Sequence, residues 1–169
     1  AVGGFTPLAF VAFVPLFLAE ELHDQRTAGR RRAFAPYAMA GFVLWNFCTT
    51  WWLGAVSEPW STRLLSGGFP TVGNTLLMGL VVMLARWLRN KAGRKAGQTG
   101  FIVLWLAFEH LHYDWDLQWP WLTLGNVFAT HPGWVQWYEI TGALGGSLWL
   151  LLLNLFAFRM ISAYRSRAP

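Results

Sequence analysis

The residues best suited to chemistry lie inside an apolar stretch near the middle of the chain. Glu109 is about eight residues into that stretch, so at about 1.5 Å per helical residue it would sit roughly 12 Å from the helix start. Trp105, Glu109 and His112 share one helix face, at i, i+4 and i+7. An ionisable group at such depth is costly unless it is paired, so it indicates either a function or a buried hydrogen-bond network.

Two interpretations of Glu109 and the nearby histidines stay open. The group forms a structural hydrogen-bond network at the end of a helix bundle, or it contacts a substrate directly. Metal or haem ligation is a weaker third alternative, because His110 and His112 are two residues apart and point to different sides of a helix. We expect no metal, no cofactor and no catalytic residue in this chain. No charged residue stands near Cys48 to activate its thiol.

A Trp-rich loop, residues 114–134, follows the helix that carries Glu109. Pro120 ends helical geometry there and restrains the residue before it. Trp115 and its neighbours either form an aromatic rim that binds acyl chains or anchor the loop among lipid headgroups. A second loop, with Trp51, Trp52 and Trp60, is expected to bring another rim to the same side. The predicted lipid or substrate pocket comprises Trp105, Glu109, His112, Trp119, Pro120 and Trp121.

The composition shows which elements must position these residues. Hydrophobic residues make up 55% of the chain and charged residues only 12%, whereas a soluble domain carries about 25% charged residues. We therefore predict an all-α integral membrane protein, with residues 1–169 forming one five-span helical bundle. The predicted spans are residues 7–19, 34–53, 72–88, 100–113 and 135–158.

The basic residues predict how the bundle is oriented. Twelve of the 13 Lys and Arg residues fall in three regions, between spans one and two, between spans three and four, and after span five. The positive-inside rule puts these regions in the cytoplasm, so the N-terminus and the aromatic loop face outward. We expect a bacterial inner membrane, with the loop on the periplasmic side. Because the charges lie in short clusters between apolar runs, we expect no nucleic-acid partner.

The last predicted span begins with small residues. Gly142 and Gly146 form a G-x-x-x-G pair beside Gly145, which favours the close approach of another helix. Asn154, deeper in the span, is expected to hydrogen-bond across helices. These four residues form the predicted packing face, through which other membrane subunits would also dock.

Several motifs together resemble the membrane domain of apolipoprotein N-acyltransferases. In order along the chain they are Phe13–Leu16 within the stretch 3–20, Ala33–Phe34, Gly41, Trp105 with Glu109, Pro120–Trp121, Leu124–Gly125, Thr141–Ser147 and Asn154. The residues in these motifs are similar to those of the Bacteroidetes-type branch of the family. One departure is His112, since many members place an Arg three residues after the Glu. An ion pair at that position is therefore not expected here.

The resemblance implies that the intact protein transfers an acyl chain from a phospholipid to the N-terminal cysteine amine of a diacylated lipoprotein. It also implies that the catalytic Glu, Lys and Cys belong to a nitrilase-like domain that these 169 residues lack, so we do not expect the chain to be active alone. We expect the chain to start part-way through a longer product. Its expected partners are phospholipids and the diacylated lipoprotein. The alternative is a catalytically silent, truncated homologue that acts as a structural subunit of a larger membrane complex.

Overall fold

The structure is a computed structural model of the chain, and it describes residues 5–27, 33–55, 59–116 and 118–167. The basic residues 30–32, which the orientation argument uses, lie outside these ranges. Every regular element within them is helical. The prediction of an all-helical chain is confirmed for this part of the protein.

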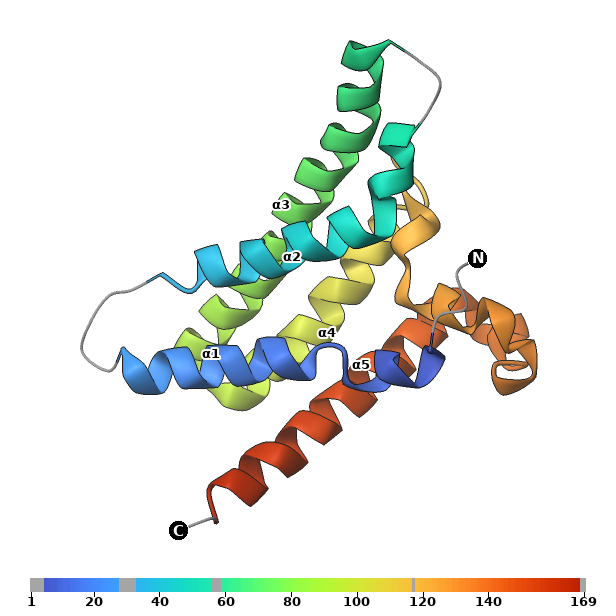
Figure 1. Ribbon diagram of the computed structural model, residues 1–169. Coiled ribbons are helices and arrows are strands. Elements are labelled where there is room, and N and C mark those ends of the chain that lie inside the picture. The colour runs from blue at the N-terminus through green and yellow to red at the C-terminus, as the bar shows by residue number, and fades with distance from the viewer. Residues whose placement is uncertain (1–4, 28–32, 56–58, 117, 168–169) are drawn as a thin grey trace.

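The described residues form five α-helices joined by shorter 3-10 helices (Figure 1). The α-helices are α1 (Val14–Arg26), α2 (Ala35–Thr50), α3 (Trp60–Ala92), α4 (Arg94–Leu111) and α5 (Tyr138–Arg165). The 3-10 helices are η1 (Thr6–Val11), η2 (Trp51–Ala55), η3 (Pro120–Leu122), η4 (Leu124–Thr130) and η5 (Pro132–Trp134). The last three lie in the aromatic loop, which is therefore a chain of tight turns.

Three helical segments are long and apolar enough to cross a membrane, namely Thr6–Arg26, Trp60–Ala92 and Tyr138–Arg165. The helix α2 has only 16 residues, and α4 includes Arg94, Lys95 and Glu109 among its 18. The presence of membrane-spanning helices therefore agrees with the sequence, whereas the count of five spans stays a prediction.

The helix α3 is much longer than the predicted span 72–88, and it continues through Pro70 without ending. Contacts with η2 hold this extra N-terminal part. Arg63 Nε donates a hydrogen bond to the Gly54 carbonyl at 2.8 Å, and Ser66 Oγ donates to the Leu53 carbonyl at 3.2 Å. The helix thus continues beyond the predicted span at its N-terminal end, where these tertiary contacts support it in spite of Pro70 and the neighbouring glycines.

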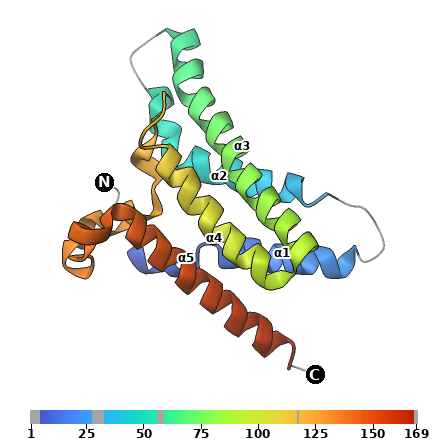
Figure 2. The same cartoon turned by 180° about the vertical axis from the view of Figure 1, so that it is seen from behind.

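Residues 89–97, between the third and fourth predicted spans, are also helical, except at Gly93. Gly93 has φ 90°, a conformation that glycine adopts readily, and it reverses the chain between α3 and α4. The helices α3 and α4 consequently pack as an antiparallel pair, and α5 lies along α4 (Figure 2). The basic residues near this turn thus project from helix ends.

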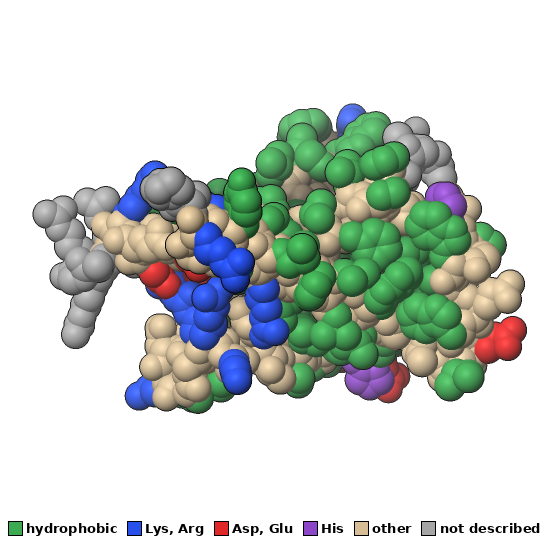
Figure 3. Space-filling view, turned by 90° about the horizontal axis from the view of Figure 1, so that it is seen from below, with side chains coloured by type: hydrophobic (Ala, Val, Ile, Leu, Met, Phe, Trp, Pro, Cys, Tyr) green, Lys and Arg blue, Asp and Glu red, His purple; other side chains and the backbone are tan. Residues whose placement is uncertain are grey.

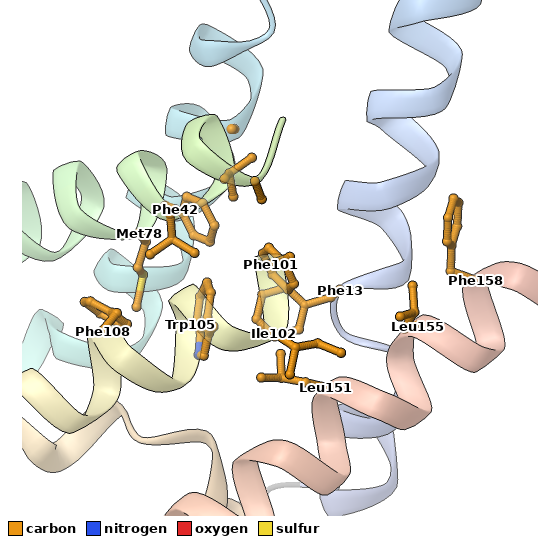
Figure 4. Packing of buried hydrophobic residues seen from close by; sticks show 14 of the residues in the cluster. Phe13, Phe42, Met78, Phe101, Ile102, Trp105, Phe108, Leu151, Leu155 and Phe158 are labelled. Atoms are coloured by element: carbon orange, nitrogen blue, oxygen red, sulfur yellow. The ribbon is translucent and has the colours of Figure 1, made fainter. Parts of the chain in front are cut away.

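The core surrounds Trp105, whose side chain is completely buried (Figure 4). Its ring centroid lies 4.7 Å from that of Phe13 and 5.6 Å from that of Phe108, both in edge-to-face geometry. Phe42 of α2 packs on another side at 6.0 Å. Aromatic pairs of this kind add to the stabilisation from burial itself. Because Trp105 of α4 contacts Phe13, immediately before α1, and Phe42 of α2, it fixes the helix that carries Glu109.

Candidate functional site

Glu109 is the hydrogen-bond centre between α4 and the aromatic loop. Its Oε1 atom accepts one bond from Trp105 Nε1 at 3.0 Å and another from the Leu124 backbone N–H at 2.8 Å. The side chain is 2% exposed, and its Oε2 atom has no partner among the described residues. Burial of a carboxylate is tolerated only with such bonds. Glu109 therefore holds the start of η4 against α4.

The same loop is held to α5 by a second set of bonds. Gly125 N donates to Ser147 Oγ at 2.9 Å, and the Gly125 carbonyl accepts from the Tyr138 hydroxyl at 2.9 Å. A Cβ atom at Gly125 would overlap the Ala143 carbonyl oxygen, so this approach requires glycine. Glu109 and Ser147 thus fix the two residues Leu124 and Gly125 between α4 and α5.

A cavity of about 700 Å³ lies between α3 and the chain that leaves α4. Its α3 wall includes Phe69, Pro70 and Asn74, and its opposite wall includes His112, Trp115 and Trp119. The His112 ring lies 5.2 Å from the Trp115 ring, and its Nδ1 atom is 2.8 Å from the Phe108 carbonyl oxygen. A carbonyl accepts only from N–H, so Nδ1 carries a proton and the ring is held in one orientation.

Three residues of this cavity carry buried N–H donors that have no hydrogen-bond partner among the described residues. The donors are Asn74 Nδ2, Trp115 Nε1 and Trp119 Nε1. Buried polar groups are nearly always satisfied, so a cluster of unsatisfied donors at one cavity calls for an explanation. Two carboxylates, those of Asp114 and Asp116, belong to the same lining and are exposed.

The structure separates the six residues of the predicted pocket into three groups. Trp105 and Glu109 are buried in the core and do not line the cavity, whereas His112 and Trp119 do. Pro120 starts η3 and, like Trp121, stands outside the lining; Trp121 is 69% exposed. The aromatic residues Trp51, Trp52 and Trp60 are also exposed and outside it.

Asn74 is one of the lining residues that the sequence did not single out, and so are its α3 neighbours Phe69 and Leu77. The available signal was an amide within a long apolar segment, the same reason for which Glu109 was singled out. Trp115 was named only as part of the rim. Within the described residues, no group of three or more His, Cys, Asp and Glu side chains is placed to hold a metal ion.

The small residues at the start of α5 do not lie on one continuous helix face. Gly142 has φ 61° and ψ −171°, outside helical geometry, so it and Gly146 do not form a G-x-x-x-G pair on one unbroken helix. Gly146 and Gly145 are close to side chains of their own segment, Tyr138 for the first and Trp137 with Thr141 for the second. Among the described residues the glycines accommodate the turn into α5, and no atom outside the immediate backbone lies within 4 Å of a Cβ placed on Gly142.

Asn154 makes the cross-helix contacts of α5. Its Oδ1 atom accepts from the Phe13 N–H at 2.7 Å, and its Nδ2 atom donates to the Ala9 carbonyl at 2.8 Å. Phe13 precedes α1, and Ala9 lies in η1. The amide thus gives the Phe13 N–H an acceptor at the break between η1 and α1, and it gives the Ala9 carbonyl a second donor beside the Ala12 N–H at 3.4 Å.

An all-helical domain with membrane-spanning helices and a tightly bonded aromatic loop is an integral membrane domain. Residues 1–156 match the family described as apolipoprotein N-acyltransferase N-terminal domain. The chain therefore belongs to the apolipoprotein N-acyltransferase family, through the membrane domain of that family.

Two curated relatives are similar along nearly the same stretch. The apolipoprotein N-acyltransferase of Chlorobaculum tepidum is 28% identical over 152 residues, which are 88% of this chain and 26% of that protein. The apolipoprotein N-acyltransferase of Geobacter metallireducens is 30% identical over 171 residues, 98% of this chain and 31% of that protein. The chain thus spans about a quarter to a third of these relatives. No solved structure matches it significantly.

Proposed function

We propose that this chain forms the lipid-binding membrane part of an apolipoprotein N-acyltransferase. In this proposal the cavity between α3 and the residues 112–119 receives a substrate of acyl transfer. The observation that carries it is the cluster of three buried, unpartnered N–H donors on residues of that cavity. The relatives are named for acyl transfer to apolipoproteins, and lipid esters carry carbonyl oxygens that accept such bonds.

The lining suits both substrates that the family resemblance implies. The walls from Phe69, Leu77 and the tryptophans are apolar and fit acyl chains, while Asn74, Trp115 and Trp119 offer donors to ester oxygens. The carboxylates of Asp114 and Asp116 offer acceptors for an ammonium group. An ethanolamine phospholipid carries an ammonium headgroup, and a diacylated lipoprotein carries an α-amino group at its N-terminal cysteine.

The proposal includes the orientation of the bundle. Five helices would cross the bacterial inner membrane, with α2 and α4 shielded by their neighbours and the cavity on the periplasmic side. The arrangement of charge supports this: Arg86, Arg89 and Arg94 stand at the α3–α4 turn, whereas Trp115 and Trp119 stand at the opposite end of α4.

Binding of a lipid probe to the purified full-length protein tests the proposal. The probe is a synthetic diacylglyceryl-cysteine peptide with a fluorophore at its C-terminus, titrated in detergent micelles. Trp119→Phe removes one N–H donor but keeps an aromatic ring, so Kd should rise by about two- to tenfold, the value of one hydrogen bond. Asn74→Leu should weaken binding similarly.

Trp121→Phe is the matched control, because Trp121 is in the same loop but outside the cavity lining. Its Kd should stay within about twofold of the wild-type value. Equal loss in Trp119→Phe and Trp121→Phe would mean that loop anchoring, and not the cavity, governs binding. Wild-type Kd in both cavity variants would overturn the proposal.

A further inference from the structure

A second cavity, of about 410 Å³, lies at the opposite end of the bundle among α1, α3, α4 and α5. It shares no lining residue with the cavity near Trp119. Apolar side chains form its floor, contributed by Leu16, Phe17, Ile102, Leu155 and Phe158. Charged side chains surround it, and Figure 3 shows the Lys and Arg side chains gathered beside acidic ones at one end of the molecule, next to a broad hydrophobic area.

Two of the arginines around this cavity are already neutralised. Glu20 Oε1 lies 3.0 Å from Arg86 Nη1 and 3.3 Å from Arg89 Nη1, and Asp24 pairs with both guanidinium groups. The side chains of the two arginines are less than a quarter exposed. These four residues form a closed network between α1 and α3, which leaves little positive charge for a ligand.

Arg94 is in a different situation. Its side chain is 55% exposed, and its one ion pair within the described residues, to Glu21 Oε1, is 3.6 Å long. The Glu21 carboxylate is already hydrogen-bonded by the Ser162 hydroxyl at 2.9 Å. The Arg94 guanidinium lies 5.4 Å above the ring of Phe158, a floor residue. A half-exposed cation is thus held at the mouth of an apolar cavity, with one counter-charge, the Glu21 carboxylate of the same lining, 3.6 Å away.

Gln98 supplies a neutral donor at the same mouth. It is one helical turn from Arg94 on α4, and both belong to the cavity lining. Its Oε1 atom accepts from Arg159 Nε at 3.0 Å. Because the acceptor end is engaged, the amide N–H groups are the end of this side chain that a ligand would meet.

We propose that this cavity binds a glycerophospholipid of the surrounding membrane, with its phosphodiester at Arg94 and Gln98 and an acyl chain along the floor. A guanidinium fork matches a phosphate in geometry and charge. Basic pockets between helices at a membrane face are suited to phospholipid headgroups. The volume lies within the range of small-ligand sites. The site is separate from the acyl-transfer substrate cavity, and its failure would leave that proposal untouched.

Photo-crosslinking of the full-length protein tests this site without interference from the other cavity. The probe is phosphatidylglycerol with a diazirine near the end of one acyl chain, added to delipidated protein in detergent, and crosslinked peptides are mapped by mass spectrometry. We expect crosslinks to α1 and α5 floor residues. Unlabelled phosphatidylglycerol should compete, whereas diacylglycerol with the same chains should need about tenfold more, since it lacks the phosphate.

Arg94→Gln should reduce these floor crosslinks about tenfold at limiting probe, because the charged partner of the phosphate is removed. Lys95→Gln is the matched control; it removes an adjacent exposed charge that is not in the lining. Leu16→Trp, which fills the floor, should also abolish the crosslinks and does not alter the charges. Equal effects of Arg94→Gln and Lys95→Gln, or equal competition by diacylglycerol, would overturn the proposal.

Discussion

Replacing Glu109 separates its two possible roles, hydrogen-bond acceptor in the core and charged group for a substrate. Glu109→Ala leaves the Trp105 Nε1–H and the Leu124 backbone N–H without an acceptor. Glu109→Gln keeps an acceptor oxygen for both donors, removes the charge and puts an amide NH2 group in the place of Oε2. The two substitutions should therefore differ strongly if the side chain acts through its hydrogen bonds.

The magnitude follows from the burial of the two donors. Each unsatisfied buried donor costs about 1–3 kcal/mol; Trp105 is fully buried, whereas Leu124 is half-buried. We expect Glu109→Ala to lower the free energy of unfolding by about 2–4 kcal/mol. That corresponds to a fall in Tm of roughly 5–15 °C in a domain of this size. Glu109→Gln should lower the free energy of unfolding by about 1 kcal/mol or less, because both donors keep their acceptor. The cost of an amide NH2 group in the place of Oε2, which has no partner within the described residues, is offset because a charge is no longer buried.

Thermal unfolding of the full-length protein in detergent, followed by tryptophan fluorescence, measures this difference. Glu139→Ala is the matched control, since Glu139 is an exposed carboxylate on α5. Binding of the diacylglyceryl-cysteine peptide provides the second readout. Glu109→Gln should bind it as wild type does. A Glu109→Gln variant that unfolds as early as Glu109→Ala, or that folds normally but loses the peptide, would refute the hydrogen-bond role and support a role for the charge.

Three further substitutions probe the contacts of α5 and the loop. Asn154→Leu has similar volume but removes the bonds to the η1–α1 break, and should lower the free energy of unfolding by about 2–4 kcal/mol in the same thermal assay. Gly125→Ala brings a Cβ into the Ala143 carbonyl oxygen and should reduce the yield of monodisperse protein on size-exclusion chromatography. Gly142→Ala must adopt φ 61° and should cost about 1–3 kcal/mol, whereas Gly133→Ala, in open space with no positive φ, should cost nothing measurable by thermal unfolding.

Features that depend on local spacing were predictable from the sequence. The i, i+4 relation of Trp105 and Glu109 predicts that they share a face, and in the structure they share a hydrogen bond. The apolar runs likewise predict the existence of the helices. The ends of the helices were less predictable. The helix α3 extends through Pro70 because it contacts η2. One of these contacts, the hydrogen bond between Ser66 and Leu53, joins residues 13 apart in sequence.

Features that depend on how the loop returns to the bundle could not be predicted. The second partner of Glu109 is a backbone N–H 15 residues away, and backbone groups carry no sequence signal. The cavity wall from α3 requires that Asn74 stand opposite Trp119, which helix periodicity alone does not specify. The break at Gly142 arises where the chain must turn from the loop into α5, so the glycine pattern fitted both a packing face and a turn.

His112 lines the cavity with an imidazole at the position where the family resemblance leads one to expect an arginine. An arginine there would sit one turn from Glu109 and pair with it, as opposite charges do when buried together. Here the imidazole instead donates Nδ1–H to the Phe108 carbonyl and packs beside Trp115. Glu109 is consequently satisfied by N–H donors of Trp105 and Leu124. The buried donors of the cavity are then the uncharged N–H groups of Asn74 and the loop tryptophans. Uncharged donors suit ester carbonyl oxygens, so under the proposed function the cavity wall would receive the acyl-ester part of a lipid and the exposed rim its headgroup.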